Sequence, residues 1–200
     1  MSWRDIPGWS GFLPTYDEMV ESCPAGGTIV EIGVAFGRSL AYLARRVIDS
    51  KKDIKIYGVD PWMPDWWLVP DSYPTHLERP TWGGEHAQFG RDLGGPFSAF
   101  VHCMRTHAPE ELERCMVLRC KSSNAAKMIG RCHGVMIDGS HNYEDVVADI
   151  ALWRPHVMPD GILAGDDFHS GDFPGVVRAV NEAFGEGGYE VRGTTWIRRI

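Results

Sequence analysis

The sequence predicts an α/β fold in which a mostly parallel sheet carries helices on both faces. Apolar segments of strand length alternate with segments of helical periodicity along much of the 200-residue chain, a pattern typical of parallel sheets covered on both sides. The first strand leads through a glycine turn into a helix. Acidic residues close this strand and three later ones, so they should meet in the crevice at the carboxyl ends of the strands, where such sheets bind ligands.

Buried apolar runs predict the strands, and apolar residues spaced i, i+3, i+4 and i+7 predict the helices. The predicted strands cover residues 28–32, 55–59, 116–120, 134–137 and 162–165, followed by a closing hairpin of 189–192 and 194–199. The predicted helical segments are 17–23, 39–47, 97–104, 143–150 and 177–184. The hairpin follows Gly187 and Gly188 and should add an antiparallel edge to the sheet.

Residues 1–200 are expected to form a single domain, which is a common domain size with room for a substantial core. Residues 1–26 hold several aromatic side chains among Pro and Gly, and we expect an arm or short helix laid over the domain. Residues 61–96 form a long aromatic-rich connection, typical of a lid or substrate-binding insert. Within it, Trp66 and Trp67 could line a substrate or pack in the core.

Composition argues against several classes of partner. The formal net charge is −7 and the pI is about 5.6, whereas nucleic-acid and anionic-membrane surfaces need a basic face. The N-terminus lacks the pattern of a signal peptide, and no apolar run approaches the ~18 residues of a membrane span. The five cysteines form no CxxC pair, so we expect reduced thiols and a cytoplasmic location.

The glycine turn carries the clearest chemical signal. Gly33 and Gly37 permit a tight turn after the first strand, and the helix that opens near Ser39 can offer free N–H groups to a polar ligand. Glu31 and Asp60 stand at the ends of the first two strands, where they can accept hydrogen bonds. A P-loop would need Lys in place of Arg38, and a dinucleotide fingerprint would need Gly in place of Ala35.

The run Glu31-x-Gly33-x-x-x-Gly37-x-Ser39, followed by Asp60, resembles the first two motifs of class I S-adenosylmethionine-dependent methyltransferases. The resemblance covers residues 27–60 and 117–200, and it implies the Rossmann-like sandwich of that family. It also implies that Glu31, Gly33, Gly37 and Ser39 surround the methionine part of the cofactor, and that Asp60 holds the ribose hydroxyls. Many members carry an acid after the third strand to contact adenine. This chain has Lys121-Ser122-Ser123 there, so Ser122 or Ser123 is expected to make that contact.

A second group of acids follows the next two strands. Asp138 closes one strand, with His141 three residues later, and Asp166-Asp167 closes the next. Neighbouring parallel strands end side by side, so these three carboxylates should repel one another unless a cation lies between them. Oxygen ligands favour Mg²⁺ or Mn²⁺. The same residues could instead cap helices or form a turn.

The pattern Asp138-x-x-His141 with Asp166-Asp167 resembles the metal-dependent O-methyltransferases of catechol and macrolide-sugar type. In catechol enzymes a lysine occupies the place of His141, and the Asp-x-x-His form is closer to the macrolide-sugar enzymes. The resemblance implies that Asp138, Asp166 and Asp167 hold the metal and that His141 is the catalytic base. Asp138 would border the metal, the cofactor and the reacting hydroxyl.

The expected function is therefore metal-assisted O-methylation of a sugar hydroxyl or of a small diol or phenolic natural product. Two alternatives remain open at this level, namely a non-catalytic cofactor-binding protein and a metal-dependent hydrolase on the same fold. Binding of S-adenosylmethionine would distinguish them, because a hydrolase would not require this cofactor. The resemblance also implies self-association into a homo-oligomer, for which the aromatic N-terminal arm could provide an interface.

Overall fold

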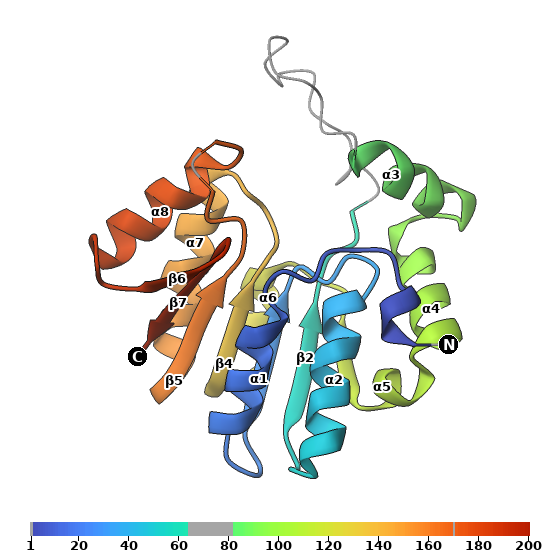
Figure 1. Cartoon of the computed structure of the whole chain (residues 1–200), viewed down its shortest axis with the longest axis horizontal. Helices are drawn as coiled ribbons and strands as arrows, with labels where there is room; N and C mark the ends of the chain where they lie inside the picture. Colours follow the sequence, from blue (N-terminus) through green and yellow to red (C-terminus); the bar gives the residue numbers. More distant parts are fainter. Residues whose placement is uncertain (1, 64–81, 170) are drawn as a thin grey trace.

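The computed structural model describes residues 2–63, 82–169 and 171–200 (Figure 1). Its centre is a seven-stranded sheet with the order β3-β2-β1-β4-β5-β7-β6. The strands are β1 (Thr28–Ile32), β2 (Lys55–Val59), β3 (Cys115–Leu118), β4 (Cys132–Ile137), β5 (Val157–Gly165), β6 (Glu190–Arg192) and β7 (Thr195–Arg199). The first five pair in parallel, and β7 pairs antiparallel with β5 and β6. The predicted sheet and its antiparallel C-terminal hairpin are confirmed.

Helices cover both faces of the sheet, as predicted. The elements are η1 (Trp3–Asp5), α1 (Leu13–Ser22), α2 (Arg38–Ser50), α3 (Trp82–Asp92), α4 (Pro96–His107), α5 (Pro109–Glu113), α6 (Ser122–Met128), α7 (Tyr143–Trp153), η2 (Arg154–His156) and α8 (Pro174–Phe184). One hydrophobic core joins α1, α2 and α4 to one face, and a second joins α6, α7 and α8 to the other. Along β1, Ile29 faces the first core and Val30 the second, which follows from the two-residue period of a strand.

The N-terminal region is more deeply integrated than the expected arm. Helix α1 begins at Leu13 rather than Asp17, and Tyr16 and Met19 are fully buried in the first core. The segment before α1 crosses above α2 at the edge of the sheet (Figure 1), where Arg38 Nη1 donates to the Gly8 carbonyl at 3.0 Å. Helix α1 is therefore part of the domain core.

The expected lid at 61–96 lies partly outside the described residues. Trp66 and Trp67 lie wholly outside them. Of the described part of this segment, residues 82–92 form α3, and Trp62 is buried in the first core against Phe97 and Phe100. The sequence pattern did not predict α3, α5 or α6. Strand β3 ends at Leu118, two residues earlier than predicted.

Within the described residues, no helix has the length and apolar character needed to cross a bilayer. The five cysteines are free thiols, as expected from their spacing. Burial raises the pKa of Cys23 and of Cys103 to about 11, which keeps both thiols protonated at neutral pH.

Candidate active site

The carboxyl ends of four neighbouring strands meet at one edge of the sheet. Ile32 is in register with Val59 of β2 on one side and Ile137 of β4 on the other, and Ile137 is in register with Gly165 of β5. The residues that follow these strands are therefore brought together from four distant parts of the sequence. This is the crevice expected from the alternating pattern.

Neighbouring parts of the protein leave room only for glycine at two positions of the turn after β1. Gly33 has φ 86°, and a Cβ added there would lie 2.0 Å from the carbonyl oxygen of Asp138. Gly37 has φ 94°, and a Cβ there would lie 2.7 Å from the sulfur of Met104 in α4. The sequence argument assigned both glycines to the ligand, but close approach of β4 and α4 already requires them.

Asp60 organises this turn. Its Oδ2 accepts from the N–H groups of Val34 and Ala35 at 2.9 and 3.0 Å, and its Oδ1 accepts from the Trp62 N–H at 2.6 Å. The Trp62 indole donates to the Ala35 carbonyl at 2.7 Å. Burial raises the pKa of Asp60, and the three backbone hydrogen bonds oppose that shift. Asp60 therefore fixes the turn as well as standing where a ribose hydroxyl is expected.

Glu31 is fully buried beneath the turn. Its Oε1 accepts from the Ser39 hydroxyl at 2.6 Å, whereas Oε2 is buried without a hydrogen-bond partner. Burial raises the pKa of Glu31 to about 8, although Ser39 and the nearby Tyr16 partly oppose the shift. An unpaired buried carboxylate oxygen is costly, and the ammonium group of a ligand would satisfy it. The residues present thus fit the methionine end of S-adenosylmethionine.

The second group of acids converges only in part, because Asp138 and Asp167 meet together with His141, whereas Asp166 does not belong to this group. Ligand atoms of Asp138, His141 and Asp167 all lie within 4.8 Å of one another, close enough to hold one metal ion. His141 Nε2 lies 2.5 Å from Asp167 Oδ2, and the His141 ring packs on Phe173 at a centroid distance of 4.3 Å. Asp167 has φ 59°, a strained conformation for a residue other than glycine.

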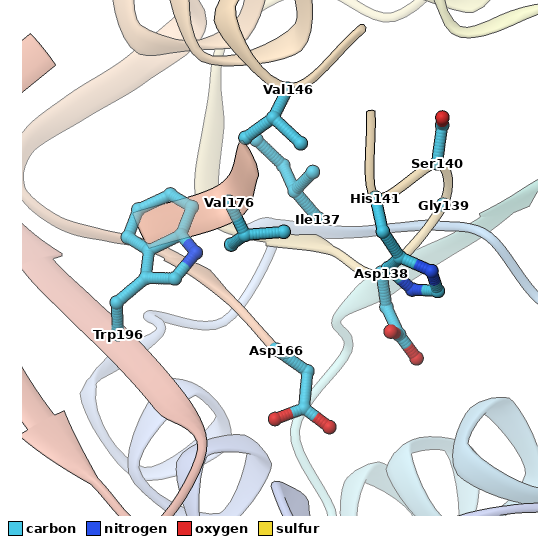
Figure 2. A pocket seen from close by; sticks show the side chains of 9 residues that line it. All are labelled: Ile137, Asp138, Gly139, Ser140, His141, Val146, Asp166, Val176 and Trp196. Atoms are coloured by element: carbon cyan, nitrogen blue, oxygen red, sulfur yellow. The ribbon is translucent and has the colours of Figure 1, made fainter. Parts of the chain in front are cut away.

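Asp166 lines a small pocket together with Asp138 and His141. Its carboxylate is bound by residues of the C-terminal hairpin. Its Oδ1 accepts from the hydroxyls of Thr194 and Thr195 at 2.7 and 3.3 Å. Figure 2 shows its carboxylate on the same side of the pocket as that of Asp138, and apolar side chains such as Val176 and Trp196 on the other side. The threonines were not predicted as site residues because they belong to an antiparallel hairpin, which the strand-end rule does not cover.

The electrostatics of this group favour a cation. Burial raises the pKa of Asp138 well above its ordinary range, and the charges of Asp167, Asp166, Glu31 and Asp60 raise it further. A divalent ion among the carboxylates would remove this repulsion. The residues whose ligand atoms meet offer two carboxylates and one imidazole, and such oxygen-rich sets are compatible with Mg²⁺ or Mn²⁺.

The two serines proposed for adenine lie at the start of α6 and differ in their surroundings. The Ser122 hydroxyl accepts from the Trp153 indole at 2.8 Å and also contacts Asp149, so it is engaged with α7. Ser123 is exposed. Of the two predicted positions, Ser123 is therefore the better placed to meet a ligand.

Comparison with known proteins agrees with the fold. The family model described as "Methyltransferase domain" matches residues 30–168. The structure of the O-methyltransferase NovP superposes with a TM-score of 0.65 at 18% identity, covering 99% of this chain and 85% of NovP. CalS11, a calicheamicin methyltransferase, gives a TM-score of 0.60 at 18% identity, covering 94% and 77%. No curated protein matches the sequence significantly.

A third structure broadens the range of functions on this fold. A putative rRNA-methylase from Clostridium thermocellum gives a TM-score of 0.59 at 13% identity, covering 98% of this chain and 100% of that one. At these identities the structural likenesses establish the fold.

Proposed function

This chain belongs to the methyltransferase domain family, and we propose that it is an S-adenosylmethionine-dependent O-methyltransferase assisted by a divalent metal. Its acceptor would be a hydroxyl of a sugar or of a small diol or phenolic natural product. The observation that supports this most is the meeting of Asp138, His141 and Asp167 at the sheet edge that also carries Glu31 and Asp60.

Two groups of residues would bind the cofactor and the metal. Glu31 Oε2 would accept from the cofactor's ammonium group, and Asp60 would hold the ribose, with Ser123 near the base. Bound S-adenosylmethionine supplies an electrophilic methyl group. Asp138, Asp166 and Asp167 would hold Mg²⁺ or Mn²⁺, which supplies Lewis acidity for a hydroxyl.

His141 would accept the proton of the acceptor hydroxyl. Its Nε2 now lies against Asp167 Oδ2, and engagement of that carboxylate by a cation would leave the nitrogen free for substrate. Phe173 packs on the imidazole and fixes its orientation. A positioned base of this kind contributes about 10²–10⁴-fold to a rate.

Two observations support the proposed class of acceptor, namely the cluster of Asp138, His141 and Asp167 and the likeness to two known methyltransferases. CalS11 is described as a TDP-rhamnose 3′-O-methyltransferase, and NovP as an O-methyltransferase. A vicinal diol on a sugar or catechol presents two oxygens that can meet a metal and His141 together. The net charge of −7 is consistent with a small-molecule acceptor, because an extended nucleic-acid surface would need basic residues.

The experiment is methyl transfer from methyl-labelled S-adenosylmethionine to a panel of nucleotide sugars and catechols, with Mg²⁺ or with a chelator. We expect transfer that the chelator abolishes. His141→Ala should lower it by about 10²–10⁴-fold with unchanged affinity for S-adenosylhomocysteine. The matched control is His169→Ala, because His169 is exposed and pairs with Asp172.

Three results would redirect the assignment. Transfer that is insensitive to the chelator would remove the metal from the mechanism. Cofactor binding without transfer to any acceptor would favour a non-catalytic binding protein. Hydrolysis of an added substrate without the cofactor would favour the hydrolase.

A further inference from the structure

Tyr16 places an unused hydroxyl group next to Glu31. The side chain comes from the first half of α1, and it is fully buried. Its Oη and Glu31 Oε2 form no hydrogen bond of normal geometry, although the hydroxyl lies close enough to Glu31 to lower the pKa of that carboxyl group as a hydrogen-bond donor. The two groups are buried beside each other without a well-formed hydrogen bond, which calls for a physical explanation.

The hydroxyl also lies near the crevice. Burial raises the pKa of Tyr16 well above its ordinary value, and the charges of Glu31, Asp138 and Asp166 raise it further. The phenol therefore stays protonated at any physiological pH. It is a neutral hydrogen-bond donor among carboxylates, which can only accept when they are ionised.

The glycine turn itself has few donors left for an anionic group. The Gly33 and Gly37 N–H groups donate to the Val59 and Val34 carbonyls, both at 2.9 Å. The N–H groups of Val34 and Ala35 donate to Asp60. The methionine end of S-adenosylmethionine carries a carboxylate as well as an ammonium group, and this carboxylate would enter a crevice lined by acids. A donor from another element would add to the N–H groups at the start of α2.

We propose that Tyr16 is a cofactor-binding residue whose hydroxyl donates to the carboxylate of S-adenosylmethionine, while Glu31 Oε2 accepts from the ammonium group of the same ligand. Together the two side chains recognise the zwitterionic amino-acid end of the cofactor. The inference rests on the proposed function, and it gives α1 a direct role in binding.

The test compares three ligands by calorimetric titration of the full chain. S-adenosylhomocysteine carries both charged groups, its decarboxylated analogue keeps only the ammonium group, and methylthioadenosine has neither. Tyr16→Phe should weaken S-adenosylhomocysteine about 10-fold or more, since hydrogen bonds to charged groups are strong. It should change the other two ligands less than about 2-fold, which lies within the effect of a minor repacking.

Two control variants separate this role from others. Glu31→Gln should weaken S-adenosylhomocysteine and its decarboxylated analogue alike. Tyr42→Phe should leave all three affinities unchanged, because the Tyr42 hydroxyl bonds Asp17 of α1 at 2.7 Å and serves only the packing of α1 on α2.

Thermal unfolding of the ligand-free variants provides an independent readout. Removing a buried hydroxyl that lacks a well-formed hydrogen bond should leave the melting temperature of Tyr16→Phe equal to or above that of the parent chain. A lower melting temperature, with equal loss for all three ligands, would show a structural hydrogen bond and overturn the proposal. If Tyr16→Phe failed to fold, it would be overturned in the same way.

The remaining outcomes distinguish a failure of this inference from a failure of the proposed function. Unchanged affinity of Tyr16→Phe for S-adenosylhomocysteine, with Glu31→Gln still weakened, would overturn the role of Tyr16 alone. Failure of the parent chain to bind any of the three ligands would overturn the proposed function as well.

Discussion

Glu31 shows how a single residue can be held ready for a ligand at a cost to stability. It is fully buried, one of its carboxylate oxygens is unpaired, and burial raises its pKa to about 8. Near neutral pH the carboxyl group therefore remains largely protonated until a cation arrives. Buried acids with raised pKa values are common at functional sites.

Glu31→Gln should stabilise the ligand-free protein increasingly as pH rises. Between the ordinary pKa of 4.5 and about 8, the folded state keeps the Glu31 proton and the unfolded state releases it, so the stability of the parent chain falls as pH rises. The variant lacks this loss. We expect nearly equal free energies of unfolding at pH 4.5 and an advantage for the variant of about 4 kcal/mol at pH 8. A constant difference across this range would contradict the raised pKa.

Gly33 and Gly26 form a matched pair that separates backbone strain from steric clash. Both have positive φ, but a Cβ on Gly26 meets nothing within 4 Å, whereas one on Gly33 meets the Asp138 backbone at 2.0 Å. Gly26→Ala should cost about 1–2 kcal/mol of stability, and Gly33→Ala more than about 3 kcal/mol. Equal losses in chemical denaturation would show that β4 does not approach this closely.

At the scale of elements, α1 links distant parts of the chain. Glu18 on this helix pairs with Arg192 and Arg199 of the C-terminal hairpin. At the C-terminal end of α1, Lys52 Nζ donates to the carbonyls of Val20, Glu21 and Cys23 at 2.6–2.9 Å. These are carbonyls that a helix end leaves unpaired, and a cation there also complements the helix dipole.

Lys52→Met should therefore destabilise the fold by about 1–2 kcal/mol, because it removes three charge-assisted hydrogen bonds at a helix end. Lys51→Met is the control, since Lys51 is exposed at the end of α2. Urea unfolding of both variants measures the effect. Equal stability of the two would show that Lys52 does not cap α1.

The elements that the sequence predicted well are those with strong local patterns. β1 and β2 match their predicted bounds because each is a short buried run between clear turns. The short α5 and α6 carry too few turns to show a helical period. The start of α1 was missed because Pro14 lies in its first turn, where a helix tolerates it.

In the site, too, residues placed by the order of the strands could be predicted, whereas residues placed by tertiary packing could not. The acids at strand ends could be predicted because parallel strands end together, and Asp138, His141 and Asp167 do meet. The positions of Tyr16 beside Glu31 and of Thr194 beside Asp166 could not be predicted, since each comes from a helix or hairpin whose position depends on tertiary packing. The double use of Asp60, on the turn as well as toward the crevice, also needed coordinates.

At the scale of the whole molecule, the described crevice concentrates negative charge. Glu31, Asp60, Asp138 and Asp166 come from four strands, and the mutual repulsion is visible in the raised pKa of Asp138. S-adenosylmethionine carries a sulfonium and an ammonium group, and a metal ion adds further positive charge. The proposed cofactor and metal would therefore offset the negative charge that the sheet concentrates here.

The most direct test of this account is calorimetric titration of the full chain with S-adenosylmethionine, with and without Mg²⁺. We expect saturable binding at one site, loss of binding in Asp60→Ala, and an effect of Mg²⁺ that is absent in Asp167→Asn. Binding without any effect of Mg²⁺ would leave the cofactor site and remove the metal. The absence of saturable binding in the parent chain would contradict the central claim that this crevice is a methyltransferase active site.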